Sequence, residues 1–211
     1  MKQSMEMYKY NVLVNPSRAQ FHLQPGINFF LTQSDKKQLH AFLLVWTAFS
    51  IKNTQPVEGW IRRAGEKCLH LGFEKIGQRL LDHSRQEADH DKMLVEDLEV
   101  LIHLWNKYYE NQLSTDELLS KKIPKSTQDY IQLHEDVIIG SEPFRQVAIE
   151  FEIERISVNY GPRMLESVQY SLGQEFTNGL SFLAEHVELD VGHTAFNLKL
   201  MESCFKENVN W

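Results

Sequence analysis

The chain has 211 residues, 42% of them hydrophobic and 24% charged, so it can bury one substantial core as a single domain over residues 1–211. Ten glycines and six prolines are few for a protein rich in tight turns, and Leu, Glu, Lys and Gln recur throughout, which disfavours an all-β barrel and predicts an all-α fold. The formal charge is -7, and no block of Lys or Arg is long enough to follow a row of phosphates, so we expect no nucleic-acid partner.

The predicted elements begin with an irregular N-terminal arm over residues 1–33, which contains Pro16 and Pro25 and has room for a short helix. Ser34 is the expected N-cap of the first long helix, and Asn178 that of the last. Helices are predicted over about residues 34–52, 57–109, 126–139, 143–172 and 179–205, with a short element over 115–120 and with the second stretch broken near Gly72 or Gly77. The sequence therefore predicts a compact bundle of about seven helices.

Two cysteines, Cys68 and Cys204, are too few for a disulfide framework and have no metal-finger spacing. The longest apolar run, residues 39–51, is interrupted by polar residues and is too short to cross a bilayer. The first residues carry no continuous apolar segment of the signal-peptide kind. We therefore expect a cytoplasmic protein with no membrane partner.

The last predicted helix has polar residues at the centre of its apolar face. At about 100° per residue, His186, Asp190 and His193 point the same way. They interrupt a stripe that otherwise contains Phe182, Leu189, Phe196 and Leu200.

The long second stretch has the same anomaly. Its core stripe contains Glu87 and His90 among residues such as Leu80 and Leu94. An ExxH pair of this kind is typical of di-iron and di-manganese sites in helical bundles, where both side chains reach a metal from adjacent turns. His83 lies on the same stripe, and the sequence leaves open whether it contacts a metal or is a hydrogen-bonded core histidine.

A third predicted helix offers Glu150, Glu152 and Glu154. Glu154 shares a face with apolar residues, including Phe151 and Val158, and is expected to point inward. Glu152 shares its side with polar and basic residues and is expected to face solvent. Glu150 lies one turn before Glu154 and is the reserve candidate.

Ionised groups at core positions need a compensating partner, and a bound cation is the simplest one. The six candidate ligands provide three carboxylates and three imidazoles, and they are Glu87, His90, Glu154, His186, Asp190 and His193. Such a mixed oxygen and nitrogen set, without cysteine, suits two divalent first-row metal ions and favours iron or manganese.

At these residues the sequence resembles the haem-oxygenase-like di-iron oxidases and oxygenases. The segment EHVELDVGH carries His186, Asp190 and His193, EADHD carries Glu87 and His90, and EFEIERIS carries Glu154. The resemblance implies a haem-oxygenase-like helical bundle of the TenA and PqqC type, two non-haem irons (Fe2+/Fe3+) with Mn as the alternative, and O2 as co-substrate. Some members place the first carboxylate where this chain has His83, so either Glu87 or an earlier residue, Glu66 or Glu74, takes that role.

The expected function is thus O2-dependent oxidation of a small organic substrate, namely an amine, an amino acid or a fatty acid. Two alternatives remain open at this stage. One is a metal-free, thiamin-type hydrolase, which would need a nucleophilic cysteine with Tyr and Glu nearby, an arrangement that the positions of Cys68 and Cys204 do not indicate. The other is a non-enzymatic helical interaction module. The sequence does not decide between a monomer and a homodimer.

Overall fold

The computed structural model describes residues 5–32 and 35–207, and in these ranges it contains helices and no β-strand. Nine of the described helices have eight or more residues, slightly more than the seven or so predicted, and the all-α prediction is confirmed. In chain order the elements are α1 (Met5–His22), α2 (Pro25–Thr32), α3 (Lys36–Thr54), α4 (Val57–His70), α5 (Glu74–Gln86), α6 (His90–Tyr108), α7 (Thr115–Leu119), α8 (Lys125–Ile139), the 3-10 turn η1 (Pro143–Arg145), α9 (Gln146–Ser171), α10 (Gln174–Thr177) and α11 (Ser181–Glu207).

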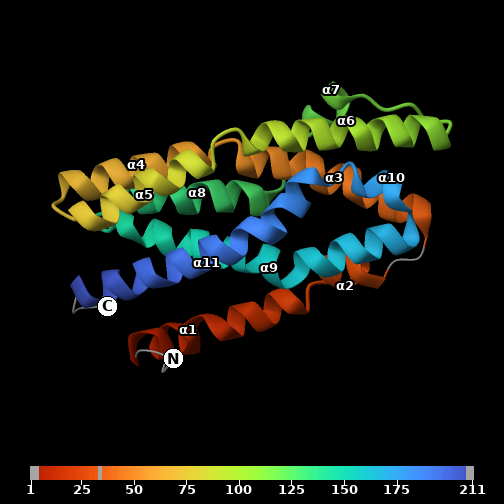
Figure 1. Cartoon of the computed structure of the whole chain (residues 1–211). Helices are drawn as coiled ribbons and strands as arrows, with labels where there is room; N and C mark the ends of the chain where they lie inside the picture. The colour runs from red at the N-terminus through yellow and green to blue at the C-terminus, as the bar shows by residue number, and fades with distance from the viewer. Residues whose placement is uncertain (1–4, 33–34, 208–211) are drawn as a thin grey trace.

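The predicted irregular arm is wrong, because residues 5–32 form α1 and α2. Pro25 opens α2, where the fixed φ of proline fits the first helical turn and its missing N–H has no intrahelical partner to lose. Pro16 lies inside α1, which contacts α9 through the ion pair of Arg18 with Glu152. Contacts of this kind stabilise a helix that the local sequence alone does not predict. Figure 1 shows α1 along the lower edge of the bundle.

The predicted 57–109 stretch is divided into α4, α5 and α6. The expected break at Gly72 is confirmed, since this residue has a φ of 87° in the left-handed region that glycine adopts without strain. Gly77 instead lies inside α5. A second, unpredicted break separates α5 from α6 at residues 87–89, where Asp89 has a φ of 70°.

The expected N-cap of the first long helix, Ser34, lies outside the described residues. Asp35 caps α3 and accepts a hydrogen bond from the backbone N of Gln38 at 2.9 Å. The predicted cap of the last helix is wrong, because Asn178 follows α10 and α11 begins at Ser181. Buried Asp97 of α6 accepts hydrogen bonds from the backbone N of Ser181 at 2.8 Å and of Phe182 at 2.9 Å. A side chain from a distant helix therefore satisfies these N–H groups.

Helices α9 and α11 pack against each other through the middle of the bundle (Figure 1). Gly161 of α9 makes this approach feasible, because a Cβ at this position would lie 2.4 Å from Cγ2 of Val187 on α11. The contact fixes the height at which the predicted ligands of α9 meet those of α11.

Two apolar clusters occupy opposite ends of the bundle. Along α9, Phe151 belongs to one cluster and Val168 to the other. Along α11, Leu183 and Leu200 are divided in the same way. The predicted polar site residues of α11, at positions 186–193, lie between these ends and form a polar layer between two apolar ones.

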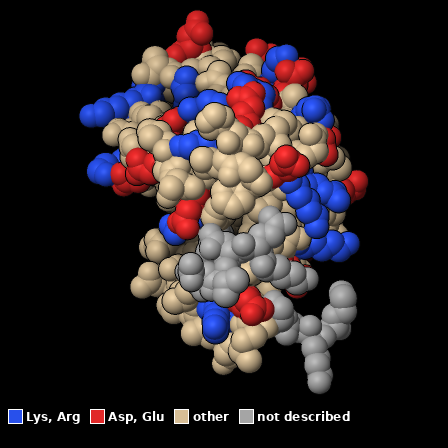
Figure 2. All heavy atoms as spheres, turned by 90° about the vertical axis from the view of Figure 1, so that its left-hand side faces the viewer, with Lys and Arg blue, Asp and Glu red and all other residues tan. Residues whose placement is uncertain are grey.

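The surface carries charges of both signs. Figure 2 views the end that holds α4 and α5, where basic and acidic side chains are interspersed. Several are paired along their own helix, as in the contact of Arg62 with Glu66 at 2.8 Å and that of Arg85 with Asp82 at 2.7 Å. Within the described residues, none of the helices combines the length and the apolar character that a membrane span requires.

Candidate metal centre

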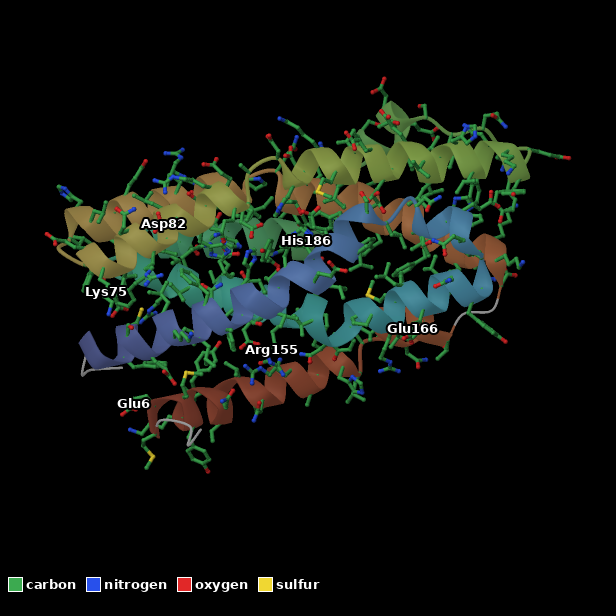
Figure 3. All side chains as sticks on the ribbon, viewed as in Figure 1. Glu6, Lys75, Asp82, Arg155, Glu166 and His186 are labelled. Carbon is green, nitrogen blue, oxygen red and sulfur yellow. The ribbon has the colours of Figure 1, made fainter. Side chains whose placement is uncertain are left out.

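Three segments bring the candidate ligands together. The first runs from the last turn of α5 to the start of α6, the second is the middle of α9, and the third is the first half of α11. Figure 3 shows His186 directed from α11 into the interior of the bundle. The side chains that meet there are His83, Glu87, His90, Glu154, His186, Asp190 and His193.

The Glu87–His90 pair spans a helix break and does not lie on adjacent turns of one helix. α5 ends at Gln86, Glu87 is its C-cap, and α6 starts at His90. The left-handed backbone of Asp89 makes the change of direction, which Asp tolerates better than most residues. The two side chains still meet, with Nδ1 of His90 donating to Oε2 of Glu87 at 2.8 Å.

The first donor set, which we call set A, consists of His83, Glu87, Glu154 and His193. Nε2 of His83 lies 3.1 Å from Oε1 of Glu154 and 3.3 Å from Oε1 of Glu87. Nδ1 of His193 lies 3.5 Å from the same Glu87 oxygen. The four ligand atoms all lie within 4.8 Å of one another.

The second donor set, set B, consists of Glu87, His90 and His186, whose ligand atoms also lie within 4.8 Å of one another. The rings of His90 and His186 are 4.6 Å apart between centroids. Glu87 belongs to both sets, with Oε1 near His83 and His193 and Oε2 at His90. A carboxylate shared in this way suits two neighbouring metal ions.

Asp190 lies beside set A but belongs to neither set. Its Oδ1 is 3.4 Å from Nδ1 of His193, while its Oδ2 accepts a hydrogen bond from Oγ of Ser157. Five of the six predicted ligands are therefore in the two sets and the sixth is adjacent. His83 completes set A, although the predicted set omits it. Its place on the polar stripe was the available signal.

Several neighbours hold these ligands in place. Nδ2 of Asn197 donates to both carboxylate oxygens of Glu154, each at 2.9 Å. Nδ1 of His186 donates to the carbonyl of Phe182 at 2.8 Å, which leaves Nε2 of the neutral ring as its lone-pair nitrogen. Contacts of this kind orient metal ligands in proteins.

Burial and neighbouring charges act in opposite directions on the pKa values of the layer. Burial alone would lower the pKa of His83, but Glu154 and Glu87 raise it to about 10. Burial would raise the pKa of Glu87, but His83 and His90 lower it well below its usual range. Burial lowers the pKa of His186, and the neutral ring is the metal-binding form of histidine.

The layer also contains buried polar atoms that have no hydrogen-bond partner among the described residues. They include Nε2 of His83, Oδ1 of Asp190 and Nδ1 of His193. Their close contacts with neighbouring groups lack hydrogen-bond geometry, so these three atoms are not satisfied by the groups around them. A cation bound among these carboxylates and imidazoles would satisfy them, and the donor set fits iron or manganese.

The neighbouring glutamates on α9 differ in their surroundings. Glu154 is buried, as predicted, and Glu150 is buried as well but belongs to neither donor set. Burial raises the pKa of Glu150 to about 8. Glu152 points away from the layer, as predicted, but its side chain is only partly exposed. It accepts hydrogen bonds from Nε of Arg18 at 2.9 Å and from the hydroxyl of Tyr10 at 2.8 Å, because α1 covers this side of α9.

A cavity of about 330 Å³ borders the metal centre. Glu87, Glu154, His186 and Asp190 form part of its wall. Most of the remaining wall is apolar, including Trp46 of α3. Such a cavity has the size and character of a site for a small organic molecule.

No known family model matches the chain, and no curated protein resembles it closely enough to count as a relative. A solved structure that does resemble it is a crystal structure of a domain of unknown function with a haem oxygenase-like fold, from Shewanella denitrificans OS217. The TM-score is 0.72 at 16% identity, over 95% of this chain and 80% of that one. The chain has a haem oxygenase-like fold. At this identity the similarity establishes the fold alone, so the function has to be argued from the site.

Proposed function

We propose that this protein is an O2-dependent oxidase or oxygenase that binds two metal ions, iron with manganese as the alternative, in sets A and B. The observation that carries the proposal is the sharing of Glu87 by two largely buried donor sets. Asp190, beside His193, would complete the ligation. The resemblance of EHVELDVGH, EADHD and EFEIERIS to the haem-oxygenase-like di-iron oxidases supports the same reading.

Bound iron would supply the redox chemistry with O2 that no protein side chain provides. The chain's own residues have separate tasks. Asn197 orients the carboxylate of Glu154, and the Phe182 carbonyl orients the ring of His186. The apolar wall of the cavity keeps water from the reacting groups and holds the substrate beside them.

The thiamin-type hydrolase alternative finds no support at the cysteines. Cys68 and Cys204 are both buried in an apolar cluster, and burial raises the pKa of the Cys68 thiol to about 12. A thiol in that setting is not a nucleophile near pH 7. Cytoplasmic location and a small-molecule substrate stay predictions from the sequence, and a homodimer is one of two oligomeric states that the sequence leaves open.

The proposal is tested by metal content and by oxygen reactivity. Protein loaded anaerobically with Fe(II) and then desalted should retain about two iron ions per chain, as a centre with two donor sets requires. Exposure to O2 should oxidise this iron faster than free Fe(II) in the same buffer. Retention of clearly less than one iron per chain, or oxidation no faster than in buffer, would refute the proposed function.

A further inference from the structure

The cavity beside the metal centre has an uneven charge. Its wall contains four carboxylates, and no Lys or Arg is among its described lining residues. The carboxylates are Glu87, Glu150, Glu154 and Asp190. An organic anion would find no Lys or Arg side chain there. In the metal-loaded protein Glu87, Glu154 and Asp190 would hold the metal ions, so Glu150 is the carboxylate left to accept a hydrogen bond from an organic cation.

Glu150 is the carboxylate that the metal centre does not use. It is only 4% exposed and belongs to neither donor set. Within the described part of the chain, its one hydrogen bond comes from Nε2 of Gln146 to Oε1. Asn53 of α3 lines the same cavity, and its buried Oδ1 has no hydrogen-bond partner in residues 5–32 and 35–207. Buried acceptors of this kind carry a free-energy cost that a ligand N–H would relieve.

A second cavity extends the first in the direction away from the metal centre. It has a volume of about 290 Å³ and shares five lining residues with the first, and these are Phe21, Ile27, Trp46, Tyr160 and Met164. Its other walls include Phe30, Leu31 and Phe42, and none of the described residues that line it is charged. Together the two spaces have an acidic part at the metal centre and an apolar part between α2, α3 and α9.

We propose that the cavity pair binds an amphiphilic amine, with its nitrogen beside Glu150 and Asn53 and its hydrocarbon chain extending past Trp46 into the second cavity. This narrows the substrate class of the proposed function from amines, amino acids and fatty acids to amines with an apolar chain. The inference that the bound amine is the substrate rests on the proposed function, whereas the binding of the amine can be tested without turnover.

The test compares ligands with the same chain and different head groups. Anaerobic, Fe(II)-loaded protein is titrated with decylamine, decanol and decanoate in a calorimeter, and butylamine tests the role of the chain. We expect decylamine to bind at least about tenfold more tightly than decanoate or butylamine, a difference of about 1.4 kcal/mol or more. Equal or tighter binding of decanoate, or no binding of any ten-carbon ligand, would overturn the proposal.

Variants assign the head-group and chain sites. Glu150→Gln keeps the size of the side chain and should weaken decylamine binding about tenfold while leaving decanol binding nearly unchanged. Glu166→Gln is the matched control, since Glu166 is exposed on the same helix and lies well away from His186 in Figure 3. If the two variants bind decylamine alike, Glu150 is not the head-group site.

For the chain site, Ile27→Trp should fill the space shared by the two cavities, with Ile27→Phe as the milder variant. We expect weaker binding of decylamine and unchanged binding of butylamine, in protein whose helical circular dichroism is retained. An equal loss for both amines would overturn the assignment of the chain. Amine binding without any O2 reactivity would refute the proposed function but not this inference. Preferred binding of decanoate together with normal O2 reactivity would refute this inference but not the proposed function.

Discussion

Glu154 and Glu152 lie two residues apart on α9, and their replacement by alanine should have different effects. Glu154→Ala should impair metal binding, whereas Glu152→Ala should lower stability and leave metal binding intact. Glu154→Ala removes a ligand of set A and both acceptors of the Asn197 amide, whose hydrogen bonds are each 2.9 Å long. Leaving this buried amide unpaired costs about 1–3 kcal/mol. Burial raises the pKa of Glu154, so removal of the carboxylate recovers part of this cost in the metal-free protein. The main loss is therefore expected in metal binding.

Glu152→Ala leaves the metal centre intact and removes a contact between α9 and α1. Glu152 accepts hydrogen bonds from Arg18 and Tyr10, and its side chain is 27% exposed. Net values of about 0.5–1.5 kcal/mol for each hydrogen bond, discounted for this exposure, give a destabilisation of about 2 kcal/mol. This exceeds the half kcal/mol or so expected of an ordinary surface substitution.

The assay is urea denaturation of each variant with and without Fe(II) under anaerobic conditions, together with the iron content after desalting. Metal that binds only the folded state at about a hundred times its dissociation constant stabilises the protein by about 2.7 kcal/mol. Wild type and Glu152→Ala should both gain this stability, and Glu154→Ala should not. Glu154→Gln retains an acceptor for Asn197 and separates loss of the ligand charge from loss of the hydrogen bond. Full metal retention by Glu154→Ala, or metal loss by Glu152→Ala, would refute the assignment of the two faces.

Three further outcomes are expected. Burial raises the pKa of Glu150 to about 8, so the folded protein binds a proton at this carboxyl more tightly than the unfolded chain does. The free energy of unfolding of metal-free wild type should therefore fall relative to that of Glu150→Gln as the pH rises from about 5 to 8. Parallel pH profiles of the two proteins in urea denaturation would contradict this. Cys68→Ala should retain iron binding and O2 reactivity, and loss of either in folded protein would show that the thiol has a role in the site. Tyr160 lines both the cavity beside the metal centre and an outer groove between α1 and α9, and its hydroxyl lies 3.1 Å from Nδ1 of His22. Tyr160→Ala should therefore increase the rate of decylamine association in stopped-flow measurements. An unchanged rate would mean that the ligand enters elsewhere.

The polar stripe of the last helix was the most informative part of the sequence. His186, Asp190 and His193 replace apolar residues at spacings that place them on one face. The structure buries His186 and Asp190 and half-buries His193, whereas Leu189 of the same predicted stripe is 40% exposed. A helical wheel, however, cannot show which atoms of different helices meet. The Oδ2 of Asp190 is held by Ser157 on another helix, and this contact depends on the relative height of α9 and α11.

The role of Glu87 as the shared residue could not be predicted from helical periodicity. The prediction from helical periodicity assumed one continuous helix through residues 83–94. No Gly or Pro lies between Gly77 and the end of the 57–109 stretch to signal a break. The structure ends α5 before Glu87 and restarts at His90. Tertiary packing on both sides decides such a break, and local propensity carries little information about it.

The position of the metal centre follows from the way the apolar residues are divided. Each of the three ligand-bearing segments has apolar residues of one cluster before its polar residues and of the other cluster after them, as Leu80 and Leu94 show for the first segment. Each helix can therefore bury both of its apolar parts only when the polar parts lie at the same level. The hydrophobic effect, which is not directional, thus aligns the ligands in a layer. Close contacts such as that of Gly161 with Val187 then set the spacing within it. On this account packing brings the candidate ligands together without a metal, and a bound metal ion would satisfy atoms that folding has already buried.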